Sequence, residues 1–177
     1  MIEMYAMLYF SAGFFGIIGV MRGWNKEVIS MAGILLALFA LFQFDNILRG
    51  IILATVPNDQ VFLVQAGLFI VVVYFAYQSR SLITPRGRSA NSRLTNGLLG
   101  AMMGAINGYL IWGSVWYFLD INGYPFEPIV IAPSPTSISA QNIGSIPLVL
   151  LGGGVGGSGE LLTIALILLF LLVIFVL

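Results

Sequence analysis

The sequence has no cysteine and no histidine, and only 8% of its 177 residues are charged. Without cysteine there is no disulfide framework, and the chain carries no information on its redox compartment. Without histidine, imidazole ligation of zinc, haem or pigment and histidine-based acid–base catalysis are excluded within the chain. We therefore expect no metal site and no cofactor.

The scarcity of charge indicates a protein surrounded mostly by lipid. A soluble domain usually carries about 25% charged residues, whereas this chain is 59% hydrophobic. Its seven basic and seven acidic residues give a net charge of zero. This balance argues against a nucleic-acid partner, because binding nucleic acid requires a concentrated basic face.

Uncharged stretches of about 20 residues predict membrane-spanning helices. The sequence predicts four of them, at about residues 4–21, 25–44, 61–79 and 97–119. Glu3 precedes the first stretch and no basic residue does, so we expect a retained span rather than a cleaved signal peptide. The predicted fold class is all-α, a polytopic transmembrane helical bundle with four core helices.

Three further segments complete this organisation. Residues 47–56 are apolar but too short to span, and they predict a short interfacial helix with Arg49 toward the lipid headgroups. Residues 120–159 hold most of the seven prolines and predict a Pro/Gly-rich extracytoplasmic loop. Residues 160–177 predict a C-terminal apolar helix, either a short span or a helix buried against a partner. The predicted division is thus a membrane domain at 1–119, then this loop, then this helix.

The distribution of basic residues predicts the orientation. All of them except Arg49 fall in the turn at residues 22–26 or in the segment at 80–93. Because short cytoplasmic loops are enriched in lysine and arginine, we expect both segments in the cytoplasm and the N-terminus outside. The second segment could also bind anionic lipid headgroups through Arg80, Arg86, Arg88 and Arg93.

Small residues recur at helical spacing in two of the predicted spans. Such stripes let two helix backbones approach closely in a membrane. We expect the helix at 97–119 to pack on the first or second helix, with homodimerisation through the same face as the alternative. The stripes consist of Gly100, Gly104 and Gly108 in the later helix and of Ala12, Gly16 and Gly19 in the first.

Gln65 and Asn107 are intramembrane polar residues. Neutral amides in lipid usually hydrogen-bond across helices, so we interpret them as structural, with a polar pathway as the alternative. No Asp, Glu, Lys or Arg is predicted at the centre of a span. Because ion-coupled transporters generally need such a group, this absence weighs against that class.

Two weak motifs do not change this interpretation. Gly152, Gly154 and Gly157 match G-x-G-x-x-G, but the following helix is apolar throughout and no acidic residue follows at the required spacing. We interpret this run as a flexible hinge. Lys26 and Ser30 are four positions apart and could share a helix face, as a Ser–Lys nucleophile would need, yet a lysine at a membrane boundary is explained by its interfacial position. We assign no catalytic residue and expect a non-enzymatic protein.

Two short motifs carry a resemblance to a known family. The first helix ends in Arg22, Gly23 and the aromatic Trp24, and Glu27 opens the second helix. The later run Leu98–Gly108 contains the glycine stripe. Together they resemble the colicin V production protein (CvpA) family over about residues 4–119. The resemblance implies a bacterial inner-membrane protein linked to toxin biosynthesis or envelope maintenance, with no known catalytic residue. Members often carry arginine where this chain has Asn107.

Three functions remain open at this point. The first is a non-enzymatic membrane protein acting in envelope maintenance or export. The second is a small accessory subunit of a larger membrane complex, photosynthetic or respiratory, that contacts other membrane proteins through the C-terminal helix and the Pro/Gly-rich loop. The third, which we favour least, is a channel or transporter.

Overall fold

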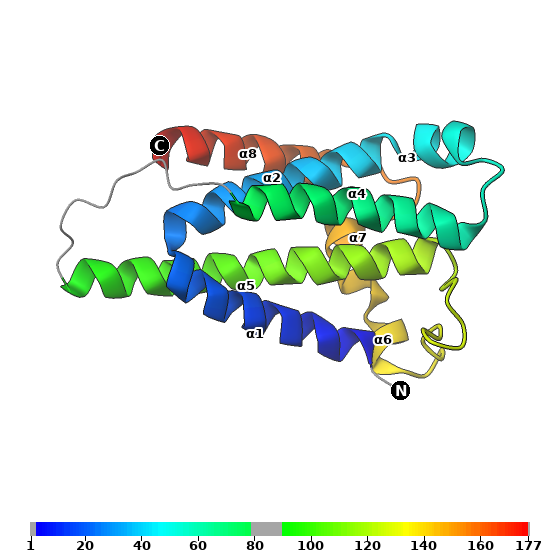
Figure 1. Ribbon diagram of the computed structural model, residues 1–177, viewed down its shortest axis with the longest axis horizontal. Helices are drawn as coiled ribbons and strands as arrows, with labels where there is room; N and C mark the ends of the chain where they lie inside the picture. The colour runs from blue at the N-terminus through cyan, green and yellow to red at the C-terminus, as the bar shows by residue number, and fades with distance from the viewer. Residues whose placement is uncertain (1–2, 79–89, 177) are drawn as a thin grey trace.

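The computed structural model describes residues 3–78 and 90–176. Over these residues the protein consists of helices and connecting turns, with no strand, which confirms the all-α prediction (Figure 1). The elements in chain order are α1 (Met4–Arg22), α2 (Trp24–Gln43), α3 (Asp45–Ile47) running into a π-helical turn (Leu48–Ile52), α4 (Asn58–Gln78), α5 (Ala90–Ile121), α6 (Ile138–Gln141), a 3₁₀ turn (Ile143–Ser145), α7 (Pro147–Gly152) and α8 (Glu160–Val176).

Four of these helices are long and apolar enough to cross a membrane. Helices α1, α2 and α4 have 19, 20 and 21 residues, or about 28–32 Å at 1.5 Å per residue. That length matches a hydrocarbon core of about 30 Å. The fourth span is the stretch Arg93–Ile121 of α5. Large apolar side chains such as Phe10, Phe14, Ile70 and Phe75 lie exposed on these helices, where lipid would cover them. The chain is a multi-pass membrane protein.

Helix α1 packs along α5 through the glycine stripe. A Cβ atom added to Gly19 would overlap the carbonyl oxygen of Gly100, and one added to Gly104 would overlap that of Phe15. Gly108 lies equally close to the backbone of Ser11, whose hydroxyl donates a 2.9 Å hydrogen bond to the Gly108 carbonyl. The two backbones are therefore in direct contact, as small-residue stripes permit.

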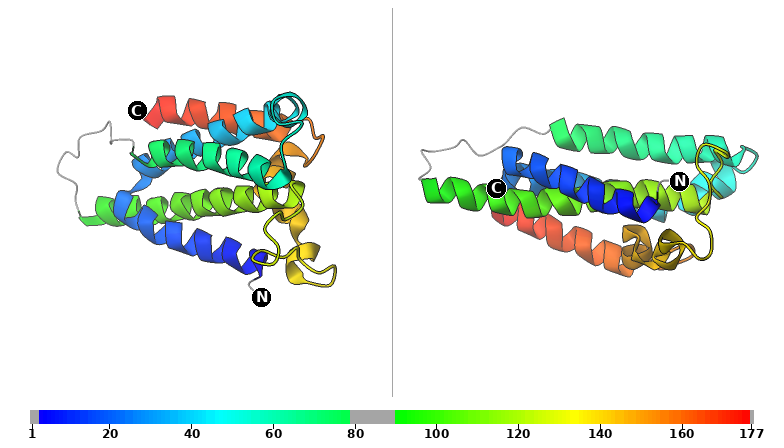
Figure 2. Two further views of the ribbon diagram at one scale, coloured as in Figure 1. Left: turned by 45° about the vertical axis from the view of Figure 1, so that its right-hand side comes forward. Right: turned by 90° about the horizontal axis from the view of Figure 1, so that it is seen from below.

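Helix α2 forms the centre of the bundle. It packs against α4, α5 and α8 (Figures 1 and 2), and its Val28, Ile34 and Leu38 are completely buried. Since α2 is covered on several sides, Glu27 and Ser30 near its N-terminus are also buried. This central position is what creates the sites described below.

The segment after α2 differs from the predicted interfacial helix at 47–56. Its helical part ends at Ile52, and residues 53–56 form a turn. Arg49 was expected to face the headgroups, but its guanidinium donates a 3.2 Å hydrogen bond to the carbonyl of Ile121 at the end of α5. The last carbonyls of a helix lack intrahelical partners, and a cation there is favoured by the helix dipole. That unmet acceptor is the physical reason for the position of the Arg49 guanidinium at the end of α5.

The C-terminal region is also more ordered than a loop with a tethered helix. Short helices α6 and α7 interrupt the Pro/Gly-rich segment, and α8 lies antiparallel to α2 with Leu162, Leu166 and Leu169 buried (Figure 1). The glycine run at residues 152–159 was interpreted as a flexible hinge, but it forms a tight turn in which the Gly159 amide donates to the Gly152 carbonyl. Contact with α2 therefore positions α8 within the bundle.

Candidate functional site: a buried polar cluster joining four helices

The turn between α1 and α2 brings a basic and an acidic side chain together. Arg22 is the last residue of α1, and Gly23 adopts a φ of 80° that only glycine takes without strain. A side chain at Gly23 would also meet the Asn96 amide of α5. Because the turn is this tight, α2 starts at Trp24, and Glu27 in its first turn reaches back to Arg22.

Arg22 and Glu27 form a buried ion pair. Nε of Arg22 lies 3.3 Å from Oε1 of Glu27, and the Glu27 side chain is fully buried. Arg22 also donates hydrogen bonds to the Ser30 hydroxyl at 3.1 Å and to the Tyr77 carbonyl at 3.0 Å. The guanidinium carbon lies 4.2 Å from the centre of the Tyr77 ring, within cation–π distance. Helices α1, α2 and α4 are thereby joined through one arginine.

Asn107 completes the cluster from α5. Its Nδ2 atom donates to Oε2 of Glu27 at 2.8 Å and to the Glu27 carbonyl at 3.1 Å. The Tyr77 hydroxyl donates to the same Oε2 at 3.3 Å. The buried carboxylate of Glu27 thus has a charged partner and two hydrogen-bond donors, which a buried charge requires. We call Arg22, Glu27, Ser30, Tyr77 and Asn107 the buried polar cluster.

The chemistry of this cluster is chiefly that of a fixed charge pair. Arg22 and Glu27 each form an ion pair or hydrogen bonds with other side chains of the cluster. Ser30 does not pair with Lys26 but accepts a hydrogen bond from Arg22 and donates one to the Ala76 carbonyl. Within the described residues, Nη1 of Arg22 and Oδ1 of Asn107 are buried and make no hydrogen bond. Oε1 of Glu27, the ion-pair partner of Arg22, also makes no hydrogen bond, so one donor group and two acceptor atoms of the cluster are unused.

A second group of polar residues lies at the opposite end of the bundle. Gln65 of α4 donates to Oδ1 of Asp45 at 2.9 Å and accepts from Nδ2 of Asn122 at 2.8 Å. Burial raises the pKa of the Asp45 carboxyl, against the opposing effect of nearby Arg49 and of the Gln65 hydrogen bond. Nearby, Tyr124 accepts a 2.9 Å hydrogen bond from the Trp116 indole, and burial raises its pKa to about 12.

The structure places the predicted site residues in different settings. Gly19, Gly100, Gly104 and Gly108 lie at the α1–α5 contact, Gly16 lies beside Ala101 and Ala105, and Ala12 is half-buried on the same helix. Trp24 packs against the core. Gln65 and Asn107 each belong to one of the polar groups just described. Arg93 is exposed on α5, whereas Arg80, Arg86 and Arg88 lie outside the described residues.

Sequence reasoning missed part of the cluster. Glu27 was expected at a polar turn on the membrane surface, yet it is buried between four helices, and Tyr77 and Ser30 were not assigned to any site. The one available signal was the pairing of opposite charges across Gly23. In residues 3–78 and 90–176, no group of three or more acidic, cysteine or histidine residues could hold a metal ion.

Comparison with models of known protein families gives a match. The family model described as Colicin V production protein matches residues 7–144, which include most of α1, all of α2 to α6 and every member of the buried polar cluster. No curated protein and no solved structure matches the chain.

Proposed function

Since this chain belongs to the Colicin V production protein family, we propose that it is a non-enzymatic protein of the bacterial cytoplasmic membrane that acts in export or envelope maintenance. The observation that carries the proposal is the buried polar cluster. Its charged groups bond to one another across α1, α2, α4 and α5 instead of lining an accessible reaction site. Such an arrangement suits a protein that works as a rigid membrane platform.

Genetic complementation in the bacterium that carries the gene tests this role. Deletion should increase the uptake of a membrane-impermeant dye or lower the amount of a secreted peptide toxin, and the wild-type gene should restore the lost property. A Glu27→Gln gene should restore it poorly, whereas Glu127→Gln, which changes an exposed carboxylate, should restore it fully. A deletion strain with an intact envelope and normal secretion would refute the proposal.

We propose that the end of the bundle with the α1–α2 turn faces the cytoplasm. Arg22, Lys26 and Arg93 gather at that end, while Asp45 and Asp120 lie at the other (Figure 1), and the positive-inside rule favours this orientation. The absence of cysteine makes the test simple. An impermeant maleimide should label Ser134→Cys in intact spheroplasts and Leu94→Cys only after permeabilisation, and the reverse pattern would invert the topology.

A second candidate function, an accessory subunit of a larger membrane complex, is favoured by α8. Its inner face packs on α2, but Ile164, Leu168 and Leu171 form an exposed apolar face on the other side. Another membrane protein could cover that face. Gentle extraction followed by native gel electrophoresis separates the candidates, because comigration with a respiratory or photosynthetic complex would support the subunit role and a lone monomer would oppose it. A channel or transporter stays the least favoured candidate, tested by flux into liposomes.

A further inference from the structure

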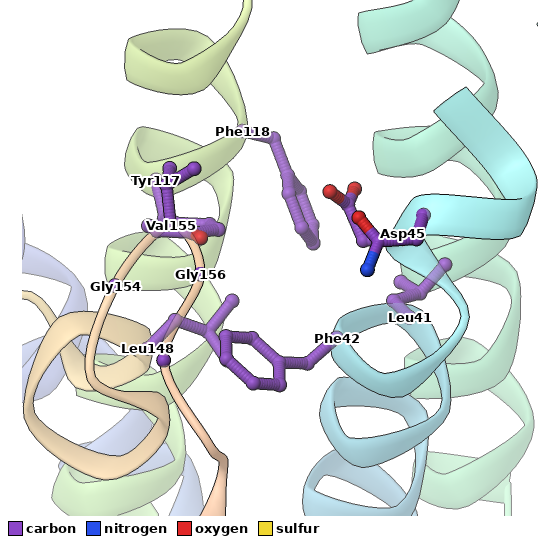
Figure 3. Close-up of a pocket in the computed structure, with 11 residues that line it drawn as sticks. Leu41, Phe42, Asp45, Tyr117, Phe118, Leu148, Gly154, Val155 and Gly156 are labelled. Carbon is purple, nitrogen blue, oxygen red and sulfur yellow. The ribbon is translucent and has the colours of Figure 1, made fainter. Parts of the chain in front are cut away.

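A cavity lies between the end of α2, the end of α5 and the glycine turn that precedes α8 (Figure 3). Its volume is about 70 Å³. Pockets for drug-sized ligands measure about 300–1,000 Å³, whereas a single water needs roughly 10–15 Å³ by this kind of measure. The cavity therefore has room for one small chemical group or a few waters. It lies where the spans of α2 and α5 end, a place that would be close to the lipid headgroups.

The walls of this cavity combine aromatic rings with one carboxylate. Phe42, Tyr117 and Phe118 line it, and Asp45 lies on the side of α3 (Figure 3). Aromatic faces attract cations through the ring quadrupole, most strongly where water is excluded. A carboxylate adds a full negative charge and accepts charge-assisted hydrogen bonds. This combination is suited to a cationic group that also carries N–H donors.

The cavity lacks the cation that its carboxylate would favour. Oδ1 of Asp45 accepts from Gln65, but Asp45 forms no ion pair with any residue that the structure describes. Arg49, on the same segment, turns instead to the Ile121 carbonyl at the end of α5. Burial raises the pKa of the Asp45 carboxyl, and nearby Arg49 and the Gln65 hydrogen bond only partly counteract this rise. A bound cation would supply the missing compensation.

The glycine turn holds the aromatic wall in place. A Cβ atom on Gly152 would lie 2.6 Å from the Phe42 ring, and one on Gly159 would lie 3.0 Å from it. Gly154, Val155, Gly156 and Gly157 line the cavity opposite. Phe118 is oriented by an edge-to-face contact with Phe69, with ring centres 5.8 Å apart. Gly152 and Gly159 therefore let the chain approach Phe42 closely, and the turn between them closes one side of this cavity.

We propose that this cavity binds a primary ammonium group, with Asp45 as its counter-ion and Phe42 and Phe118 as its aromatic walls. Two sources share this chemistry at a membrane surface. One is the ethanolamine headgroup of a phospholipid, and the other is a free amine in the surrounding water. The inference is independent of the proposed role in export or envelope maintenance, because it concerns a different end of the bundle from the buried polar cluster.

The test uses the full-length protein purified in detergent and in lipid nanodiscs. Titration calorimetry with ethanolamine hydrochloride measures the free amine, and native mass spectrometry compares retention of phosphatidylethanolamine with that of phosphatidylglycerol. Asp45→Asn preserves the acceptor for Gln65 but removes the charge, and it should weaken binding about tenfold or more. Phe42→Leu, which retains the carboxylate, should weaken it about three- to tenfold. Glu127→Gln, an exposed carboxylate outside the cavity, should leave binding unchanged.

Each result decides the proposal. Asp45-dependent retention of phosphatidylethanolamine over phosphatidylglycerol assigns the site to a lipid headgroup, and Asp45-dependent binding of ethanolamine without lipid preference assigns it to a soluble amine. The proposal is overturned if neither probe binds the wild-type protein. It is equally overturned if Asp45→Asn and Phe42→Leu proteins, with melting curves showing that they fold, bind as the wild type does, or if Glu127→Gln causes the same loss as Asp45→Asn.

Discussion

Asn107 in the middle of α5 donates a 2.8 Å hydrogen bond to Oε2 of Glu27 in the first turn of α2. Both side chains are completely buried. One amide thus serves the carboxylate that Arg22 neutralises, although 80 positions separate the two residues in sequence. The relationship links the middle of α5 to the turn that joins α1 and α2.

Replacing Asn107 with leucine should destabilise the protein. The change removes a donor from a buried carboxylate, for which we expect a loss of about 1.5–3 kcal/mol of unfolding free energy. Unfolding in mixed detergent micelles measures it. Gln60→Leu, an amide replaced on an exposed position of α4, is the matched control and should change stability little. Equal stability of the two variants would mean that the Asn107–Glu27 bond contributes nothing.

Removing one partner of the Arg22–Glu27 pair should lower the unfolding free energy strongly, and removing both should lower it by less than the sum of the two single losses. A single Glu27→Gln or Arg22→Gln change leaves an uncompensated buried charge, which typically costs about 3–5 kcal/mol. The double variant carries two neutral amides, so its loss should be smaller than the sum of the single losses. A double-mutant cycle by detergent unfolding measures this coupling. Additive losses would show that the two charges do not interact.

Alanine substitutions at two glycines of α1 should differ in their effect on stability, because only one of the two lies too close to the backbone of α5 to admit a Cβ atom. A Cβ atom at Gly19 would overlap the Gly100 carbonyl, whereas at Gly16 its nearest neighbour would be the Ala101 carbonyl at an ordinary 3.4 Å. We therefore expect Gly19→Ala to lower the melting temperature in detergent and Gly16→Ala to leave it nearly unchanged or raised. Gly104→Leu, which would overlap the Phe15 backbone, should be more damaging still. If Gly16→Ala and Gly19→Ala melt alike, the close approach of the two backbones is wrong.

The stability of the protein without a bound amine should depend on the ionisation of Asp45. Burial raises the pKa of this carboxyl in the folded state. The contribution of Asp45 to folding stability is therefore fully present below the pKa that its carboxyl has in the unfolded chain. It is lost as the pH rises through the higher pKa of the folded state. Asp45→Asn should thus melt higher than wild type at neutral pH, and the difference should shrink toward acid pH. Thermal melts across pH measure this, and a difference that grew with acidification would contradict the sign.

Much of the architecture could be predicted from the sequence because it depends on local composition. The four long helices follow from uncharged stretches, and the structure gives their ends as Met4–Arg22, Trp24–Gln43, Asn58–Gln78 and Ala90–Ile121. The largest difference in bounds is in α5, which begins seven positions before the predicted residue 97. Polar residues such as Asn91 and Ser92 concealed this extension, because hydropathy detects only the apolar part of a helix.

The candidate site could be predicted only in part. Arg22 and Glu27 were singled out as one family motif and Asn107 as a polar residue within a span, and nothing in the sequence indicates that Asn107 touches the other two. Their meeting depends on α2 turning back beside α5 and on Tyr77 arriving from α4. The same limit applies to Asp45 and Phe42, whose common cavity needs the glycine turn before α8.

The sequence by itself determined that this is a helical membrane protein, because the free energy of transfer into lipid depends on the composition of each stretch. It also determined the family, because the family model matches the amino-acid sequence itself over residues 7–144. Only the tertiary structure decided which charges are buried, since burial depends on which helices surround a residue. Glu27 has a first-turn position typical of a surface carboxylate, and the packing of α1, α4 and α5 around the start of α2 buries it completely.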